Sequence, residues 1–290
     1  MLTIDPKEIS TAKLHSYLLN AIAPRPIAFA STIDNKGKVN LSPFSFFNVY
    51  SSNPPIMIFS VNRRVRDNTT KHTLENILQT NQVVINIVDH TIVHQASLSS
   101  TEYPKGVNEF IKSGLTMRKS EVVKPYRVAE SPVQFECKVN EVIALGDQGG
   151  AGNLIIAEVL KIHIRPEVLD ENNAIDPLKI DLVARMGGDW YTRAREGMFE
   201  VPKPLRSKGI GVDQIPEFIR NSNTLTGNDL GRLANVERLP LKQEVEDYIS
   251  ENMKVRELLS GDDRSQVHQR AKELIEQNKV VEAWKLLLAK

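Results

Sequence analysis

The alternation of apolar and polar residues is most regular in the middle of the chain. Residues 133–145 and 154–164 each alternate over a long stretch, which is the pattern of a strand with one buried face. The loop between them runs from Gly146 to Gly152 and is rich in glycine, a residue that tolerates backbone angles other residues avoid. We therefore predict that the two segments pair as antiparallel strands.

Shorter apolar runs predict further strands at 27–33, 56–62 and 83–88. The first run is followed by Asp34-Asn35-Lys36-Gly37, a turn sequence that predicts a hairpin into residues 39–48. Apolar residues at helical spacing and helix-ending glycines predict helices within 5–20, 73–79, 91–99 and 108–112. Strands that recur with tight turns and little helix between them favour a closed or partly open antiparallel barrel over alternating βαβ units.

The C-terminal third differs in composition. After Pro204, residues 205–240 predict a loop-rich connector that wraps over the barrel. Two amphipathic helices are predicted at 241–259 and 265–288, with Gly261 ending the first and Asp262-Asp263 starting the second. The predicted parts are a barrel domain at 1–204, a wrapping connector at 205–240, and a helical hairpin at 241–290 that packs on the barrel or on a partner subunit.

Charge and cysteine content narrow the functional classes. The chain has 37 basic and 36 acidic residues, so its net charge of +1 supplies no long-range field for nucleic acid or a membrane surface. The amino terminus lacks an apolar core of signal-peptide length and no apolar run approaches the roughly 20 residues that span a bilayer, so we expect a cytoplasmic protein. A single cysteine, Cys137, rules out an intramolecular disulfide and a thiolate-rich metal site, and its alternating surroundings predict a buried structural thiol.

Common catalytic and nucleotide motifs are missing from the sequence. There is no G-x-G-x-x-G after a strand and no G-x-x-x-x-G-K-[ST], so neither a Rossmann fold nor a P-loop is indicated. His90 and His94 stand four residues apart, but no glutamate between them completes an H-E-x-x-H zinc site. No metal site is predicted, and a hydrolase is unsupported.

The stretch from Val39 to Asn76 carries the strongest candidate site. Hydroxyl, amide and aromatic side chains are interleaved in residues 41–48, and a basic, hydroxyl-rich run occupies residues 63–73. This run lies between a strand end and a predicted helix start near Thr73, where free N–H groups and the helix dipole favour an anion. The segment suits a ligand with a planar body and an anionic tail. The alternative is a solvated loop whose charges face water.

The order of several motifs resembles one known family. N-L-S-P-F-S-F-F-N is followed by P-P-I-M-I-F-S, K-H-T-L-E-N-I and V-V-I-N-I-V, and further matching segments continue to about residue 200. The set is similar to the flavin reductase-like proteins of the FMN-binding split-barrel superfamily, including flavoredoxin. The resemblance covers about residues 20–200. It implies an antiparallel Greek-key split β-barrel with peripheral helices, a homodimer, and non-covalent FMN near the subunit interface.

Carried over position by position, the resemblance implies which residues bind the cofactor. The flavin ring would lie against Ser45, Phe46, Phe47 and Asn48. Ser60 and Asn62 would meet the ribityl chain or phosphate. The phosphate would be held by Arg63, Arg64, Lys71 and Thr73.

Three positions need separate mention within the resemblance. His72 stands where the family's usual K-D-T motif has a carboxylate. Asn153 stands in place of the usual histidine of a later D-H-x-L segment, which weakens the transfer of a nicotinamide-contacting role to that loop. Arg185, with the segment that follows it, corresponds to a family segment near the flavin.

The resemblance implies an NAD(P)H-dependent oxidoreductase that passes electrons through FMN to free flavin, a partner oxygenase or a metal acceptor. Because the cofactor carries this reaction, no catalytic residue is predicted. Two alternatives stay open: a flavoredoxin-like FMN electron carrier reduced by a partner redox protein, and an interaction protein that binds no flavin.

Overall fold

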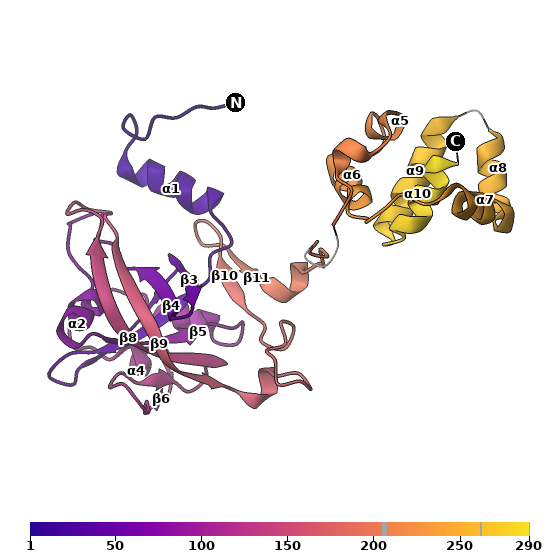
Figure 1. Ribbon diagram of the computed structural model, residues 1–290. Coiled ribbons are helices and arrows are strands. Elements are labelled where there is room, and N and C mark those ends of the chain that lie inside the picture. Colours follow the sequence, from indigo (N-terminus) through magenta and orange to yellow (C-terminus); the bar gives the residue numbers. More distant parts are fainter. Residues whose placement is uncertain (205–207, 262, 290) are drawn as a thin grey trace. The chain divides into compact units, whose positions relative to one another are not determined.

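The computed structural model describes residues 1–204, 208–261 and 263–289 (Figure 1). The chain divides into two compact units, Met1–Met198 and Phe199–Lys290. Each unit has its own apolar core, so each is described by itself. Among the helices in the described ranges, none has the length and apolar character needed to cross a membrane.

The first unit is built on a seven-stranded sheet in which all neighbouring strands are antiparallel. The strands are β1 (Ala28–Ile33), β2 (Val39–Phe44), β3 (Phe47–Ser52), β4 (Pro55–Ser60), β5 (Gln82–Ile87), β8 (Val133–Ala144) and β9 (Asn153–Ile164). Their spatial order is β2-β1-β5-β8-β9-β4-β3, so hairpins are joined by longer crossings, as in a Greek key. The predicted antiparallel barrel is confirmed, and so is the pairing of residues 133–145 with 154–164.

The barrel core forms where the inward faces of these strands meet helix α2 (His72–Thr80). Phe59, Ile85 and Ile155 are fully buried there, together with Ile77 from the helix. Cys137 lies in the same core, and burial raises the pKa of its thiol far above the ordinary value. This agrees with the predicted structural role of the cysteine.

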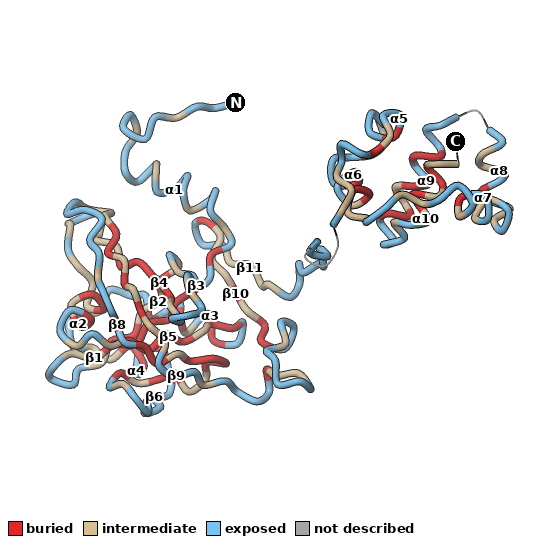
Figure 2. Tube along the Cα trace, in the orientation of Figure 1, coloured by how far each residue is buried: buried red, intermediate tan, exposed pale blue. Residues whose placement is uncertain are grey.

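The other helices of this unit lie at its periphery (Figure 2). They are α1 (Thr11–Ala21), α3 (Val93–Leu98) and α4 (Glu109–Ser113). The hydroxyl of Ser10 caps α1 by accepting from the Lys13 N–H, which matches one of the starts expected from the sequence. α1 buries none of its residues, although it carries Leu14 and Leu18. Two small two-stranded sheets complete the unit: β6 (Met117–Arg118) with β7 (Arg127–Val128), and β10 (Val183–Arg185) with β11 (Tyr191–Arg193).

The second unit is helical. Its elements are α5 (Glu217–Arg220), α6 (Gly227–Ala234), α7 (Lys242–Glu251), α8 (Met253–Ser260), α9 (Arg264–Glu276) and α10 (Val280–Leu288). The predicted hairpin of two long helices is wrong, because each predicted helix is broken. Asn252 is extended between α7 and α8, and Asn278 adopts a left-handed conformation between α9 and α10. Asp263 caps α9, and Asp262 lies outside the described residues.

The predicted connector also differs from the structure. Ile215, Ile219 and Leu233 are buried in one core with Trp284, so the described part of 205–240 packs with the C-terminal helices. The described part of this segment is therefore part of the helical unit's core rather than a loop-rich connector, and its wrapping over the barrel stays a prediction. The predicted boundary at residue 205 lies outside the described residues.

Substituting Leu233 tests whether the helical unit unfolds independently. Leu233→Ala should destabilise this unit by about 2–5 kcal/mol, because it leaves a cavity beside Trp284. Trp284 fluorescence, measured in a Trp190→Phe background during urea unfolding, reports the change, since Trp190 is the tryptophan of the first unit. The matched control is Val281→Ala, an exposed position that should stay within about 0.5 kcal/mol. A parallel shift of the barrel's β-sheet circular dichroism would argue against two separate cores.

Candidate functional site

A cavity of about 540 Å³ opens where α1, the chain leaving β4 and the tip of the β8–β9 hairpin meet. Five of the predicted site residues line it, namely Phe46, Asn62, Arg63, Arg64 and Lys71. Its apolar side is completed by Leu14 and Leu18 of α1. The structure therefore brings an aromatic and aliphatic wall together with the basic run, as the sequence pattern suggested.

The tip of the β8–β9 hairpin holds the polar side of the cavity in place. The Arg63 N–H donates to the Ala151 carbonyl at 2.9 Å, and the Gly150 N–H donates back to the Arg63 carbonyl at 3.1 Å. A Cβ at Gly149 would lie 2.9 Å from the Val65 carbonyl oxygen, and one at Gly152 would lie 2.6 Å from the Ser60 hydroxyl. The glycine-rich loop is thus required for close backbone approach.

Ser60 and Asn62 continue this link. The Ser60 hydroxyl donates to the Asn62 Oδ1 at 2.8 Å, and the Asn62 amide donates to the Gly150 carbonyl at 3.2 Å. Ser60 itself is buried, whereas Asn62 is half-buried and faces the cavity. Asn153, which replaces the histidine expected from the resemblance, donates from its amide to the Val61 carbonyl at 2.9 Å and so supports the same segment.

The three arginines of the basic run are largely engaged within the protein. Arg63 donates to the side chain and carbonyl of Asn68 at 2.6 and 2.7 Å. Arg64 and Arg66 share the carboxylate of Glu102, at 3.2 and 2.6 Å. Hydrogen bonds from Arg66, followed by the charges of both arginines, lower the pKa of Glu102. The sequence analysis missed Glu102, because nothing in its local sequence ties it to a loop 36 residues away.

Lys71 is the exception among the cations of the cavity. Its ammonium group lies 5.0 Å from the centre of the Phe44 ring, and it has no ion pair or hydrogen bond within the described ranges. Burial, followed by the charge of Arg64, lowers its pKa, while Glu102 opposes the shift. Lys71 is therefore a half-buried cation whose charge is left for a ligand to neutralise.

The aromatic side of the cavity includes a residue that the sequence analysis did not select. Phe46 is 37% exposed, and the ring of His15 meets it nearly edge-on, with 6.3 Å between ring centroids. His15 belongs to α1, whose leucine spacing predicted a helix but gave no sign of which surface the helix would face.

The remaining predicted residues lie around the cavity but do not line it. Phe47 packs against the barrel core, and Asn48 is exposed with its side chain accepting from the Val49 N–H. Thr73 is buried and accepts from the Asn40 amide at 2.9 Å. His72 lines a separate narrow hollow beside Asn40 and Lys105. The side chains of His72 and Thr73 are thus not brought together with Lys71.

Arg25 and Arg185 form a second basic feature near Ser45. Arg25 is buried and donates to the carbonyls of Leu19, Ile22 and Met186, and it has no carboxylate partner among the described residues. Its Nε donates to the Ser45 hydroxyl at 3.5 Å, and burial and the charge of Arg185 lower its pKa. Arg185 pairs with Arg25 through the backbone and places its guanidinium 4.6 Å from the Tyr191 ring centre. Arg25 stands between Pro24 and Pro26, and its local sequence gives no sign of this role.

Comparison with known proteins identifies the fold and the family. The sequence model of the Flavin reductase like domain matches residues 21–180, which is more than half of the chain. The chain belongs to the flavin reductase-like family. The resemblance seen in the motifs is thereby confirmed.

Two solved structures illustrate the fold. Nitrilotriacetate monooxygenase component B from Bacillus cereus is 28% identical, with a TM-score of 0.65 over 69% of this chain and 98% of that one. A protein with a split barrel domain from Shewanella frigidimarina is 26% identical, with a TM-score of 0.58 over 70% of this chain and all of that one. The predicted split barrel is confirmed by these similarities.

The matches to sequence relatives span nearly the whole of each relative but only about two thirds of this flavin reductase-like chain. An uncharacterized protein of Aquifex aeolicus is 38% identical over 188 residues, which is 65% of this chain and 93% of the relative. Another, from Halalkalibacterium halodurans, is 34% identical over 71% of this chain and 98% of the relative. About a third of the chain lies outside these matches, and the family match ends at residue 180, before the helical unit begins.

Lys71→Met should stabilise the ligand-free protein. The lowered pKa means that the charged form of Lys71 is disfavoured in the folded state, and this penalty is present below the folded pKa and fades as pH rises through it. We expect the free energy of unfolding to rise by about 0.5–2 kcal/mol at neutral pH, which is the usual gain when a destabilising residue kept for function is replaced. The rise should be smaller at alkaline pH. Thermal unfolding at several pH values measures it.

The control for this substitution is Lys112→Met. Lys112 is exposed and also lies over an aromatic ring, 5.5 Å from the centre of Tyr103. Its replacement should change the stability by no more than about 0.5 kcal/mol. If Lys71→Met were less stable than the unaltered protein at neutral pH, the charged lysine would not be destabilising the folded state.

Proposed function

We propose that this chain binds FMN non-covalently in the cavity beside α1 and acts as an oxidoreductase that uses NADH or NADPH. The observation that carries the proposal is the unpaired, half-buried ammonium of Lys71 in a cavity of about 540 Å³. A cavity of this size lies within the usual range for small-molecule sites. Family membership supports a flavin as the ligand.

The residues present fit a ligand with a flat apolar body and a phosphate. Phe46, Leu14 and Leu18 offer surface for the ring, and Ser45, Phe47 and Asn48 adjoin Phe46 along the chain. Lys71 offers its charge to the phosphate, with Asn62, Arg63 and Arg64 lining the same cavity. Ser60 would act by orienting Asn62.

His72 and Thr73 would contribute through the backbone. They stand in the first turn of α2, where helix N–H groups lack partners within the helix. Their side chains face elsewhere, but these N–H groups and the helix dipole favour an anion beside Lys71. Arg185, with Arg25, would add positive charge near Ser45.

When bound, FMN would supply the redox chemistry, accepting a hydride from a reduced nicotinamide and passing electrons onward. The protein's part is to bind, orient and shield. Lys71 and the start of α2 hold the anionic end, Phe46 and His15 shape the wall, and Leu14 and Leu18 limit the access of water. No side chain is assigned a proton transfer, so no catalytic residue is proposed.

Acceptor and assembly belong to the same proposal. The acceptor would be free flavin, a partner oxygenase or a metal complex, and the similarity to component B of a monooxygenase favours an oxygenase.

A homodimer is proposed as well, supported by the exposed Val49 and Tyr50 on the edge strand β3 and by α1, which buries no residue. Sedimentation equilibrium of the purified protein tests the dimer.

A flavoredoxin-like electron carrier is the second candidate. It is favoured by the way Leu14, His15 and Leu18 of α1 line the cavity, since they reduce the room left for a nicotinamide beside a flavin. Stopped-flow mixing separates the two: rapid bleaching of the visible flavin band by NADH or NADPH is expected of the enzyme. Bleaching by dithionite alone would identify the carrier. Purified protein that is colourless and does not bind added FMN would contradict both and favour an interaction protein.

Lys71→Met should weaken FMN binding about tenfold or more. Losing one charge-assisted bond to a phosphate removes roughly 1.5–3 kcal/mol, and 1.4 kcal/mol corresponds to a factor of ten. Quenching of FMN fluorescence on titration gives the Kd. Arg63→Ala is expected to weaken binding in the same direction, and Lys112→Met serves as the control with an unchanged Kd. Equal affinity in Lys71→Met and the unaltered protein would remove the phosphate assignment.

A further inference from the structure

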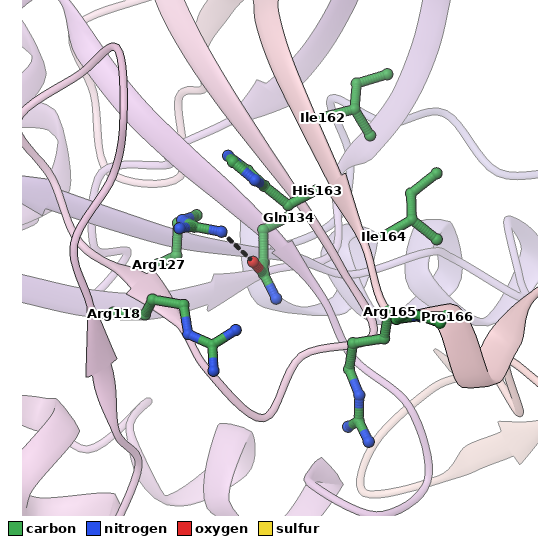
Figure 3. Close-up of a pocket in the computed structure, with 8 residues that line it drawn as sticks. All are labelled: Arg118, Arg127, Gln134, Ile162, His163, Ile164, Arg165 and Pro166. Carbon is green, nitrogen blue, oxygen red and sulfur yellow. Dashed lines mark hydrogen bonds between the residues drawn. The ribbon is translucent and has the colours of Figure 1, made fainter.

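A second hollow, of about 400 Å³, lies at the far end of β9 from the hairpin tip (Figure 3). Its walls come from β6, β7, β8 and the end of β9. β9 is 12 residues long, which corresponds to roughly 40 Å of strand, so the hollow is remote from the cavity beside α1. The flavin proposal uses none of its residues.

Three arginines line the hollow, and none of the described residues that line it carries a carboxylate. Arg118, Arg127 and Arg165 come from separate segments and surround it, with Gln134 and His163 between them (Figure 3). Ile162 and Ile164 add apolar surface, and they are 52% and 39% exposed. The three positive charges line one hollow, although the Arg165 guanidinium points away from Arg127 in Figure 3, and like charges so placed repel one another unless an anion lies between them.

Arg127 is the buried member of the group. It is 8% exposed and donates to Gln134 Oε1 at 3.2 Å and to the Lys119 carbonyl at 3.0 Å. Among the residues that the structure describes, its buried Nε has no hydrogen-bond partner, and the nearest carboxylate oxygen, on Glu136, is 3.8 Å away. A buried guanidinium with an unused donor is costly unless something else compensates it.

Glu136 is already engaged with other groups. Its carboxylate accepts the N–H groups of Glu121, Val122 and Val123 and lies 2.7 Å from His163 Nε2. Burial opposes ionisation of Glu136, but these hydrogen bonds together lower its pKa. Glu136 is therefore a carboxylate that backbone donors already satisfy, and it forms an ion pair with Arg127 at 3.8 Å without accepting a hydrogen bond from the Arg127 Nε.

The two outer arginines are exposed and weakly paired. Arg118 has no ion pair or side-chain hydrogen bond in the part of the chain that the structure describes. Arg165 lies 3.4 Å from the exposed carboxylate of Glu167 and donates to the Glu130 carbonyl at 3.2 Å. Glu130 and Glu167 face an adjoining hollow, and the Glu130 carboxylate accepts from the Thr116 N–H. Exposed ion pairs of this kind contribute little to stability. Both arginines can therefore turn toward a ligand at little cost in free energy.

We propose that this hollow is a binding site for a phosphorylated small molecule, with the phosphate held by Arg118, Arg127 and Arg165. Arg118 and Arg165 would turn toward the ligand, and guanidinium groups so placed match the oxygens of a phosphate through paired hydrogen bonds. Ile162 and Ile164 would then pack against an apolar part of the same molecule. The site is independent of the proposed flavin site, and each can fail without the other.

Isothermal titration calorimetry at constant ionic strength tests the proposal on protein that carries one equivalent of FMN and has been freed of excess. The cavity beside α1 is then occupied, and no free FMN, itself a phosphate ester with an apolar ring, competes for the hollow. Phenyl phosphate is the main probe, inorganic phosphate lacks its apolar part, and benzoate replaces the phosphate with a carboxylate. We expect saturable one-to-one binding of phenyl phosphate, weaker binding of inorganic phosphate, and binding of benzoate at least tenfold weaker. Should the protein take up no FMN, the same titration of the flavin-free protein still tests this site.

Arg118→Gln and Arg165→Gln should each weaken phenyl phosphate binding about tenfold, and both positions are exposed enough to spare the fold. The matched control is Arg195→Gln. The Arg195 side chain is 41% exposed, against 43% for Arg165, and each of the two arginines pairs with one carboxylate. Unchanged binding in both test variants, or no saturable binding at all, would overturn the site. Benzoate binding as tightly as phenyl phosphate would overturn the assignment to phosphate.

Discussion

The docking of the β8–β9 hairpin tip onto the chain that leaves β4 is the contact on which the candidate site depends. Two backbone hydrogen bonds join Arg63 to Ala151 and Gly150. Gly149 allows the main chains to approach closely, and Gly152 leaves room for the Ser60 hydroxyl. β4 and β9 are also neighbours in the sheet, so the hairpin tip extends an interaction that the barrel already makes. The basic run is thereby held against a rigid support, which places its cations on one side of the cavity.

The cations of the basic run differ in whether a protein group engages them. Arg63 is engaged with Asn68, and Arg64 and Arg66 are neutralised by Glu102, so these side chains mainly order the loop. Lys71 follows them at the start of α2, is half-buried, and has no such partner in the described part of the chain. A charge kept in this state lowers stability, and proteins retain such groups mainly where a ligand compensates them.

The helical unit is stabilised by a core of its own. Its core is closed around Trp284, whose indole N–H donates to the Leu233 carbonyl at 2.9 Å. Residues from α5 and α6 complete this core, so the segment expected to be a connector is part of a folded unit. The unit therefore meets the usual requirement for a domain, a core of its own, and it lies outside the family match.

Much of the barrel could be predicted from the sequence because its signals are local. Alternation along 133–145 and 154–164 indicated paired strands, and the Asp34–Gly37 turn indicated the first hairpin. The basic run and Phe46 were recognised as parts of one site because they are close in sequence. The C-terminal helices were placed approximately, but their breaks at Asn252 and Asn278 depend on single residues that periodicity does not detect.

The sequence by itself determined the strands, the antiparallel hairpins and the chemical character of the main site, since each depends on neighbouring residues. Only the tertiary structure decided that α1 lines the cavity, that Glu102 neutralises two arginines, and that the side chains of His72 and Thr73 face away from Lys71. It also decided that Arg118, Arg127 and Arg165 meet at one hollow. These outcomes depend on strand order and on side-chain direction, which bring together residues far apart in the chain and which no local pattern encodes.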